Sequence, residues 1–151
     1  FALPEKFDLK YTDKDGKEKL AMVIHRSSTG CTERTISYIL EKTQGNLPLW
    51  LSPIQTKVMS MNEDVKDYAL QINKKLLDTG IRSELDNRNE SIGKKVKGAI
   101  TEKAFYLITV GEQEMKENKI AVRKRDSKEI ITMTLEEFRE KINTEIFKKT
   151  L

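Results

Sequence analysis

The chain has 151 residues, of which 34% are charged and 37% are apolar, a composition that excludes a disordered chain. It suits a soluble protein of one domain, or of one domain with part of another. The 28 Lys and Arg residues outnumber the 24 Asp and Glu residues, which permits a nucleic-acid partner without requiring one. One cysteine excludes an internal disulfide, and no apolar run is long enough for a membrane helix.

The first part of the chain is predicted to be a short β-hairpin followed by a helix. An alternating segment at residues 7–11 and an apolar run at residues 20–24 flank the turn residues 13–17. Residues 32–43 have the periodicity of a helix, and the sequence Gly45-Asn46-Leu47-Pro48 indicates its end and a linker. The chain starts at Phe1 without a signal-peptide pattern, so we expect a processed chain or a piece of a longer protein.

From about residue 47 onward, predicted strands alternate with predicted helices. The strands are expected at residues 54–59, 81–86, 105–110 and 119–124, the last two joined by a polar turn; the helices are expected at residues 62–79 and 91–103 and from Thr134. Thr134 and Glu137 have the spacing of a capping box. This order predicts an α/β domain, residues 47–151, with a mixed, largely parallel sheet flanked by helices, preceded by residues 1–46.

The positive charge is concentrated in one stretch of the chain. Residues 87–125 contain ten Lys and Arg against five Asp and Glu, which gives +5 where the whole chain has +4. A solvated lysine-rich surface is the ordinary explanation of such a run. The concentration favours a face that binds a polyanion.

Two segments of this basic stretch could bind nucleic acid. Residues 86–95 join a strand to a helix at the carboxyl end of a sheet, where ligands of open α/β folds bind. A capped surface turn explains the same residues equally well. Arg123 and Arg125 lie on one side of a predicted strand, either presenting two guanidinium groups to a nucleotide or protecting a sheet edge.

Two residues near the start of the chain are weaker candidates when taken alone. His25 is the only histidine, and a zinc site needs at least three protein ligands, so a packed or surface histidine is the simpler reading. Arg34 follows Gly30-Cys31-Thr32-Glu33 at a loop-to-helix junction. It either belongs to a capped helix or binds a phosphate through its planar guanidinium group.

Several blocks of sequence together resemble one enzyme family. Val23-Ile24-His25-Arg26 followed by Gly30-Cys31-Thr32-Glu33-Arg34 resembles motif 3 of the class II aminoacyl-tRNA synthetases in its threonyl form. Residues 48–55, 80–82, 86–95, 106–111 and 120–123 continue the resemblance in order, over nearly the whole chain. It implies the C-terminal region of a threonyl-tRNA synthetase: the last strip of a catalytic domain, residues 1–46, and an anticodon-binding domain, residues 47–151.

The resemblance implies roles for three residues of the first part. His25 matches a ligand of the catalytic zinc, which needs a cysteine and another histidine from earlier in the enzyme. Arg34 matches the motif 3 arginine that stabilises the ATP phosphates, a catalytic role. Cys31 stands where this motif usually has a serine, at a substrate-binding position. Zinc and ATP with Mg²⁺ are therefore the expected cofactors of the full-length enzyme, with none expected on this chain alone.

The resemblance also implies contacts with the threonine tRNA. The positions that match anticodon-reading residues are Asn89, Lys103, Glu114 and Arg123, and the residues expected at the tRNA backbone are Arg88, Lys94, Lys95, Lys97 and Arg125. Threonine and ATP are further expected partners of the full-length enzyme, which is expected to be a cytoplasmic homodimer. This chain alone is expected to be a monomer that binds the anticodon stem-loop and no membrane.

Three hypotheses follow, of which the threonyl enzyme is favoured. The second is the related domain of a prolyl, histidyl or glycyl enzyme, or a non-catalytic accessory protein built from one. The third is an unrelated small α/β binding domain. His25 before motif 3 favours the threonyl group over the second hypothesis. The chain lacks the first two class II motifs, so we expect no threonine activation by the chain alone.

Overall fold

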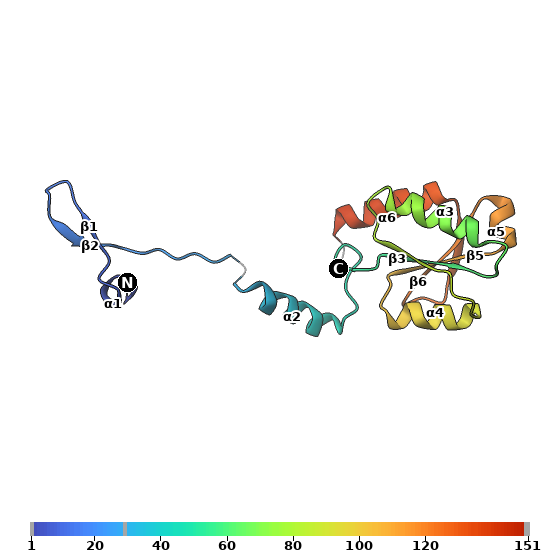
Figure 1. Cartoon of the computed structure of the whole chain (residues 1–151), viewed down its shortest axis with the longest axis horizontal. Helices are drawn as coiled ribbons and strands as arrows, with labels where there is room; N and C mark the ends of the chain where they lie inside the picture. Colours follow the sequence, from blue (N-terminus) through green and yellow to red (C-terminus); the bar gives the residue numbers. More distant parts are fainter. Residues whose placement is uncertain (1, 29, 150–151) are drawn as a thin grey trace. The chain divides into compact units, whose positions relative to one another are not determined.

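The computed structural model describes residues 2–28 and 30–149 and divides the chain into two compact units, Phe1–Ser37 and Tyr38–Leu151 (Figure 1). The elements in chain order are α1 (Ala2–Lys6), β1 (Lys10–Thr12), β2 (Glu18–Leu20), α2 (Thr32–Thr43), β3 (Thr56–Ser60), α3 (Lys66–Leu77), β4 (Ser83–Asp86), α4 (Ile92–Thr101), β5 (Tyr106–Val110), α5 (Glu112–Glu117), β6 (Ile120–Lys124), β7 (Ile130–Met133) and α6 (Leu135–Lys148). None of the helices described is long and apolar enough to cross a membrane.

The first unit contains the predicted hairpin in a shortened form. Strands β1 and β2 pair in antiparallel orientation, and Gly16 occupies the left-handed region at φ +74° in the turn between them. The second strand was predicted at residues 20–24, which is wrong, because β2 already ends at Leu20. Residues 22–24 are exposed, so no packed face fixes them as a strand. Helix α1 was not predicted.

The second unit is built on a five-stranded sheet with the strand order β4-β3-β5-β6-β7. Strand β3 pairs in parallel with β4 and β5, whereas β6 pairs in antiparallel orientation with β5 and β7. The predicted mixed α/β sheet with flanking helices is confirmed. Parallel pairing is confined to the strands β4, β3 and β5, so the sheet is less parallel than the sequence predicted.

Two elements of the second unit have no counterpart among the predicted ones. Helix α5 fills the stretch expected to be a polar turn between β5 and β6, and β7 adds an edge strand. The sequence of α5 is EQEMKE and none of its residues is buried, so it lacks the apolar periodicity by which helices are predicted. Both elements border the site described below.

Helices α3 and α6 cover one face of the sheet (Figure 1). The main core forms there between alternate strand residues, such as Val58 and Ile108, and the apolar stripes of the two helices. Phe138 of α6 is fully buried, and its ring meets that of Tyr106 edge-on at 5.3 Å between centroids. The capping box at the start of α6 is confirmed, since Thr134 Oγ1 accepts from the Glu137 N–H at 3.3 Å.

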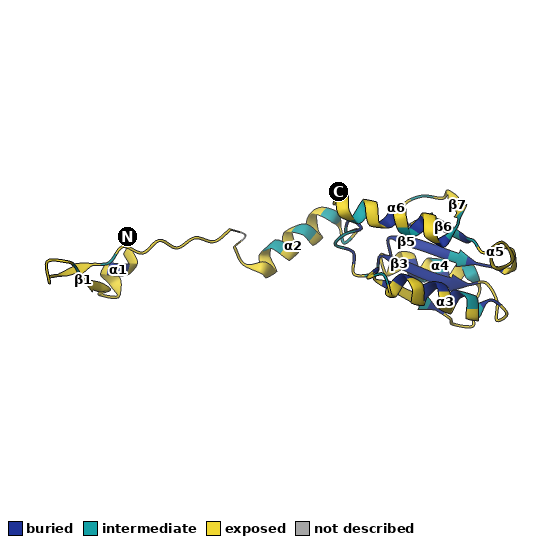
Figure 2. Ribbon diagram, turned by 90° about the horizontal axis from the view of Figure 1, so that it is seen from above, coloured by how far each residue is buried: buried dark blue, intermediate teal, exposed yellow. Residues whose placement is uncertain are grey.

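The opposite face is covered by α4, over a smaller core that Met59 of β3 and Leu107 of β5 form with Ala99. Figure 2 shows the central strands β3 and β5 as buried. Strand β7, by contrast, has no buried residue, and Ile130 is 63% exposed. The part of this face beside α4 therefore remains accessible to a ligand.

Candidate nucleic-acid interface

A pocket of about 360 Å³ lies on the α4 side of the sheet. Its walls come from α4 (Ile92, Val96), β5 (Leu107, Thr109), β6 (Ala121, Arg123) and β7 (Ile130, Thr132), with Met61 after β3 and Glu114 of α5. Apolar walls with a few polar groups are typical of ligand sites, and the volume falls within their usual range. The polar groups are therefore the ones that could make this pocket selective for a particular ligand.

Glu114 and Arg123 are the two charged residues that line this pocket. The carboxylate of Glu114 accepts a hydrogen bond from the Gly111 N–H at 2.9 Å through Oε2. Arg123 Nε donates to the Ser127 carbonyl oxygen at 2.7 Å. Among the residues that the structure describes, each side chain is thus held by one hydrogen bond, which leaves a carboxylate oxygen and the terminal guanidinium nitrogens for a ligand. An acceptor beside donors is the combination that reads a base edge.

The structure thus brings together two of the four predicted anticodon residues. The other two flank α4 in sequence: Asn89 lies in the loop before the helix, and Lys103 follows its end. Both are exposed. Lys103 has φ +62°, and its Nζ donates to the Gln44 carbonyl oxygen at 3.3 Å. Neither residue lines the pocket, so a ligand touching all four would extend along α4.

Three of the five predicted backbone contacts are accessible. Lys94 and Lys97 are exposed on α4. Arg88 binds the buried carboxylate of Asp86 through Nε at 2.9 Å and Nη2 at 2.6 Å, while its own side chain stays 52% exposed. The hydrogen bonds from Arg88 hold the pKa of Asp86 below its ordinary value, against the opposing effect of burial.

Lys95 and Arg125, the other two residues predicted to contact the tRNA backbone, are buried. Lys95 is 2% exposed, its Nζ donates to the Ser60 carbonyl oxygen at 2.8 Å, and desolvation lowers its pKa. Arg125 Nη2 donates to the Leu47 carbonyl oxygen at 2.8 Å, and Nη1 to that of Lys103 at 3.2 Å. The charged groups of both side chains donate hydrogen bonds to backbone carbonyl oxygens within the domain. Sequence alone does not separate them from exposed neighbours.

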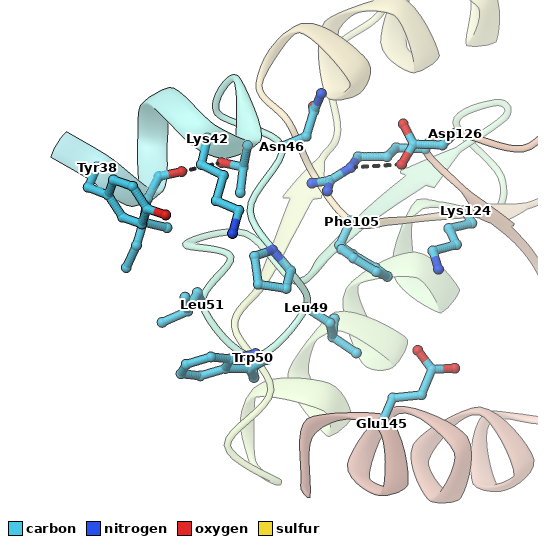
Figure 3. A pocket seen from close by; sticks show the side chains of 14 residues that line it. Tyr38, Lys42, Asn46, Leu49, Trp50, Leu51, Phe105, Lys124, Asp126 and Glu145 are labelled. Atoms are coloured by element: carbon cyan, nitrogen blue, oxygen red, sulfur yellow. Dashed lines mark hydrogen bonds and ion pairs between the residues drawn. The ribbon is translucent and has the colours of Figure 1, made fainter. Parts of the chain in front are cut away.

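Arg125 lines a second pocket, of about 680 Å³, together with the C-terminal half of α2 and residues 46–51 (Figure 3). Lys124 Nζ and the guanidinium carbon of Arg125 each lie 4.8 Å from the centroid of the Phe105 ring. Arg123 and Arg125 therefore line different pockets, since Arg123 lines the one beside α4. No predicted anticodon residue lines the second pocket.

The described residues of the first unit do not assemble a metal site among themselves. His25, Cys31 and Arg34 are all exposed. Cys31 Sγ donates to Glu33 Oε2 at 2.6 Å, which lowers the pKa of Glu33. Within residues 2–28 and 30–149, no three His, Cys, Asp or Glu side chains are grouped as a metal site would need. The described residues by themselves therefore do not fit a zinc ion.

The sequence reasoning missed Met61, which lines the pocket, and Gly111, which lies against Met61 and Glu114. Met61 and Gly111 directly follow the ends of neighbouring strands, β3 and β5. Gly111 belongs to the block that resembles the synthetase family, but nothing in the sequence indicates that Met61 packs on it. Their meeting depends on the parallel register that pairs Ser60 with Val110.

Comparisons with known proteins find relatives over nearly the whole chain. A threonine–tRNA ligase of Clostridium botulinum (strain Eklund 17B / Type B) is 42% identical over 149 residues, which are 99% of this chain and 23% of that protein. The RNA-binding domain of threonyl-tRNA synthetase from Cryptosporidium parvum Iowa II has a TM-score of 0.78 at 33% identity, covering 95% of this chain and 36% of that one. Prolyl-tRNA synthetase from Cryptosporidium parvum, 20% identical with a TM-score of 0.72, shares the fold over 96% of this chain and 33% of its own.

The chain spans about a quarter of the length of the curated ligases it matches. The family described as "Anticodon binding domain" matches residues 52–145, which hold the whole five-stranded sheet, the helices α3 to α5, most of α6 and the pocket beside α4. With that match covering more than half of the sequence, the chain belongs to the anticodon-binding domain family.

Proposed function

We propose that residues 47–151 recognise the anticodon stem-loop of threonine tRNA through the face beside α4. The observation that carries this proposal is the pocket in which Glu114 and Arg123 are each anchored by one hydrogen bond and keep polar atoms for a base. Asn89 and Lys103 add contacts at the two ends of α4. The 42% identity to a threonine–tRNA ligase, against 20% to the prolyl enzyme, supports threonine tRNA as the partner.

Exposed cations of the same face would hold the RNA backbone. Lys94 and Lys97 on α4 and the partly exposed Arg88 can approach phosphates, and such contacts supply affinity that falls with salt. Base selection would then depend on the pocket, since phosphate contacts carry no sequence information directly.

In a full-length threonine–tRNA ligase, residues 1–46 would complete the catalytic domain. Arg34 would bind the phosphates of ATP, His25 would supply one of several zinc ligands, and Cys31 would line the threonine site. Such an enzyme would act as a cytoplasmic homodimer with ATP and Mg²⁺. The chain alone is expected to be a monomer that does not activate threonine. Threonine-dependent pyrophosphate exchange by the isolated chain would contradict this.

The anticodon proposal is tested by the Arg123→Ala variant of the intact chain. Binding of stem-loops with a threonine anticodon and with unrelated anticodons is measured at one fixed salt concentration. The variant should bind the threonine stem-loop more weakly by about 1–3 kcal/mol and lose its preference for it. Equal losses on all stem-loops would show that Arg123 supplies only charge. A wild-type chain without anticodon preference would refute the proposal itself.

A further inference from the structure

Gly111 stands at the junction between β5 and α5, where the pocket acquires its carboxylate. Its N–H donates to Glu114 Oε2 at 2.9 Å, three residues further along the chain. Met61 crosses the same spot from the end of β3, held there by a hydrogen bond from its N–H to the Val110 carbonyl oxygen at 3.0 Å. Glu114 and Met61 both line the pocket.

The backbone conformation does not require a glycine at this position. Gly111 has φ −122° and ψ −174°, an extended conformation that any residue adopts. The requirement is one of space. A Cβ at position 111 would lie 2.8 Å from Met61 Sδ and 2.9 Å from Glu114 Oε2, closer than real Cβ atoms approach such neighbours. The missing side chain is thus what lets both groups occupy their places.

Both neighbours are the ends of flexible side chains, which decides what a larger residue would do. A methyl group at position 111 can be accommodated by moving the Met61 thioether and the Glu114 carboxylate, without moving a strand. The cost to folding is therefore small. The cost falls on the pocket, because the carboxylate loses its hydrogen bond to the 111 N–H and the wall formed by Met61 is displaced.

We infer that Gly111 is a positioning residue that holds the Glu114 carboxylate in place for reading an anticodon base. This inference rests on the proposed function of the pocket. The hydrogen bond to Oε2 leaves Oε1 of Glu114 without another hydrogen-bond partner among residues 2–28 and 30–149. That oxygen then faces a base edge in a fixed orientation, beside the donors of Arg123. Fixed polar groups discriminate bases better than mobile ones, because less ordering is needed on binding.

The test uses the Gly111→Ala variant of the intact chain, with the wild-type chain as its reference. Affinities for stem-loops with threonine and unrelated anticodons, their salt dependence and urea unfolding are measured. We expect Gly111→Ala to lose about ten-fold in affinity for the threonine stem-loop only, with salt slope and unfolding midpoint unchanged.

A double-mutant cycle with Glu114→Gln separates positioning from a general packing effect. If Gly111 acts through Glu114, adding Gly111→Ala to Glu114→Gln should cost little further affinity. Additive losses, equal losses on all stem-loops, or a preserved anticodon preference in Gly111→Ala would each overturn the inference. These results leave the proposed function intact as long as the wild type prefers the threonine stem-loop. A wild type without that preference overturns both.

Discussion

The two faces of the five-stranded sheet use the same strands for different purposes. Residues that alternate along β3 and β5 point either into the core under α3 and α6 or toward α4. Two long helices close the first face, and its core includes the fully buried Phe138. One helix covers the second face, and the sheet beside it lines a pocket with two charged side chains. Stability therefore comes mainly from the first face, and under the proposed function the second face selects the ligand.

The strongest test of this division is the Phe138→Ala substitution on the closed face. Removing a fully buried ring leaves a cavity against Tyr106, so the free energy of unfolding should fall by about 3–5 kcal/mol. Urea unfolding measures this loss. The fraction that remains folded should bind the threonine stem-loop like the wild type. A selective loss of the anticodon preference would show that the two faces are coupled.

A smaller stability effect is expected from Arg125→Ala, with Arg123→Ala as its matched control. Arg125 is buried and bonds two backbone carbonyls, whose loss of partners should cost about 1–3 kcal/mol in unfolding free energy. The stem-loop preference should be unchanged. Arg123→Ala should give the reverse result. If Arg125→Ala instead lowers the salt slope of binding, the guanidinium group of Arg125 contacts a phosphate.

The lysines of α4 also differ in exposure. Removing an exposed one should change RNA binding by about one phosphate contact. Lys97→Gln removes an exposed ammonium group and should lower the slope of log affinity against log salt by about 1. Lys95→Met keeps the aliphatic stem and removes an ammonium group that is bonded to Ser60. That variant should keep the wild-type slope. Equal slopes for both variants would show that burial does not separate these two lysines in function.

The sequence predicted the closed face better than the open one. The helices that cover the closed face have regular apolar stripes. The capping-box spacing of Thr134 and Glu137 predicts the start of α6. Helix α5 carries no such stripe, and β7 is an exposed edge strand, so neither was predicted. The walls of the pocket therefore could not be assembled from periodicity. Glu114 and Arg123 were named only through resemblance to the synthetase family.

The sequence also does not show which of the Lys and Arg side chains are buried. Lys94, Lys95 and Lys97 are chemically alike, and only the orientation of α4 on the sheet sends Lys95 inward toward Ser60. Arg125 is likewise turned onto the linker carbonyl of Leu47, 78 residues earlier in the chain. Both contacts are non-local. A count of the positive charges in the basic stretch therefore overstates the number of cations that are exposed to an RNA ligand.

The smallest expected effect concerns the Asp86–Arg88 pair at the edge of the α4 face. Hydrogen bonds from Arg88 lower the pKa of Asp86 in the folded state below its ordinary value of 3.8. The pair therefore stabilises the fold above that pH, and this contribution is lost as the pH falls through the lowered pKa. Arg88→Gln should raise the folded-state pKa of Asp86, so that the variant loses less stability than the wild type as the pH falls. Unfolding free energies between about pH 7 and pH 2 measure this, and an unchanged profile would show that Arg88 does not control Asp86.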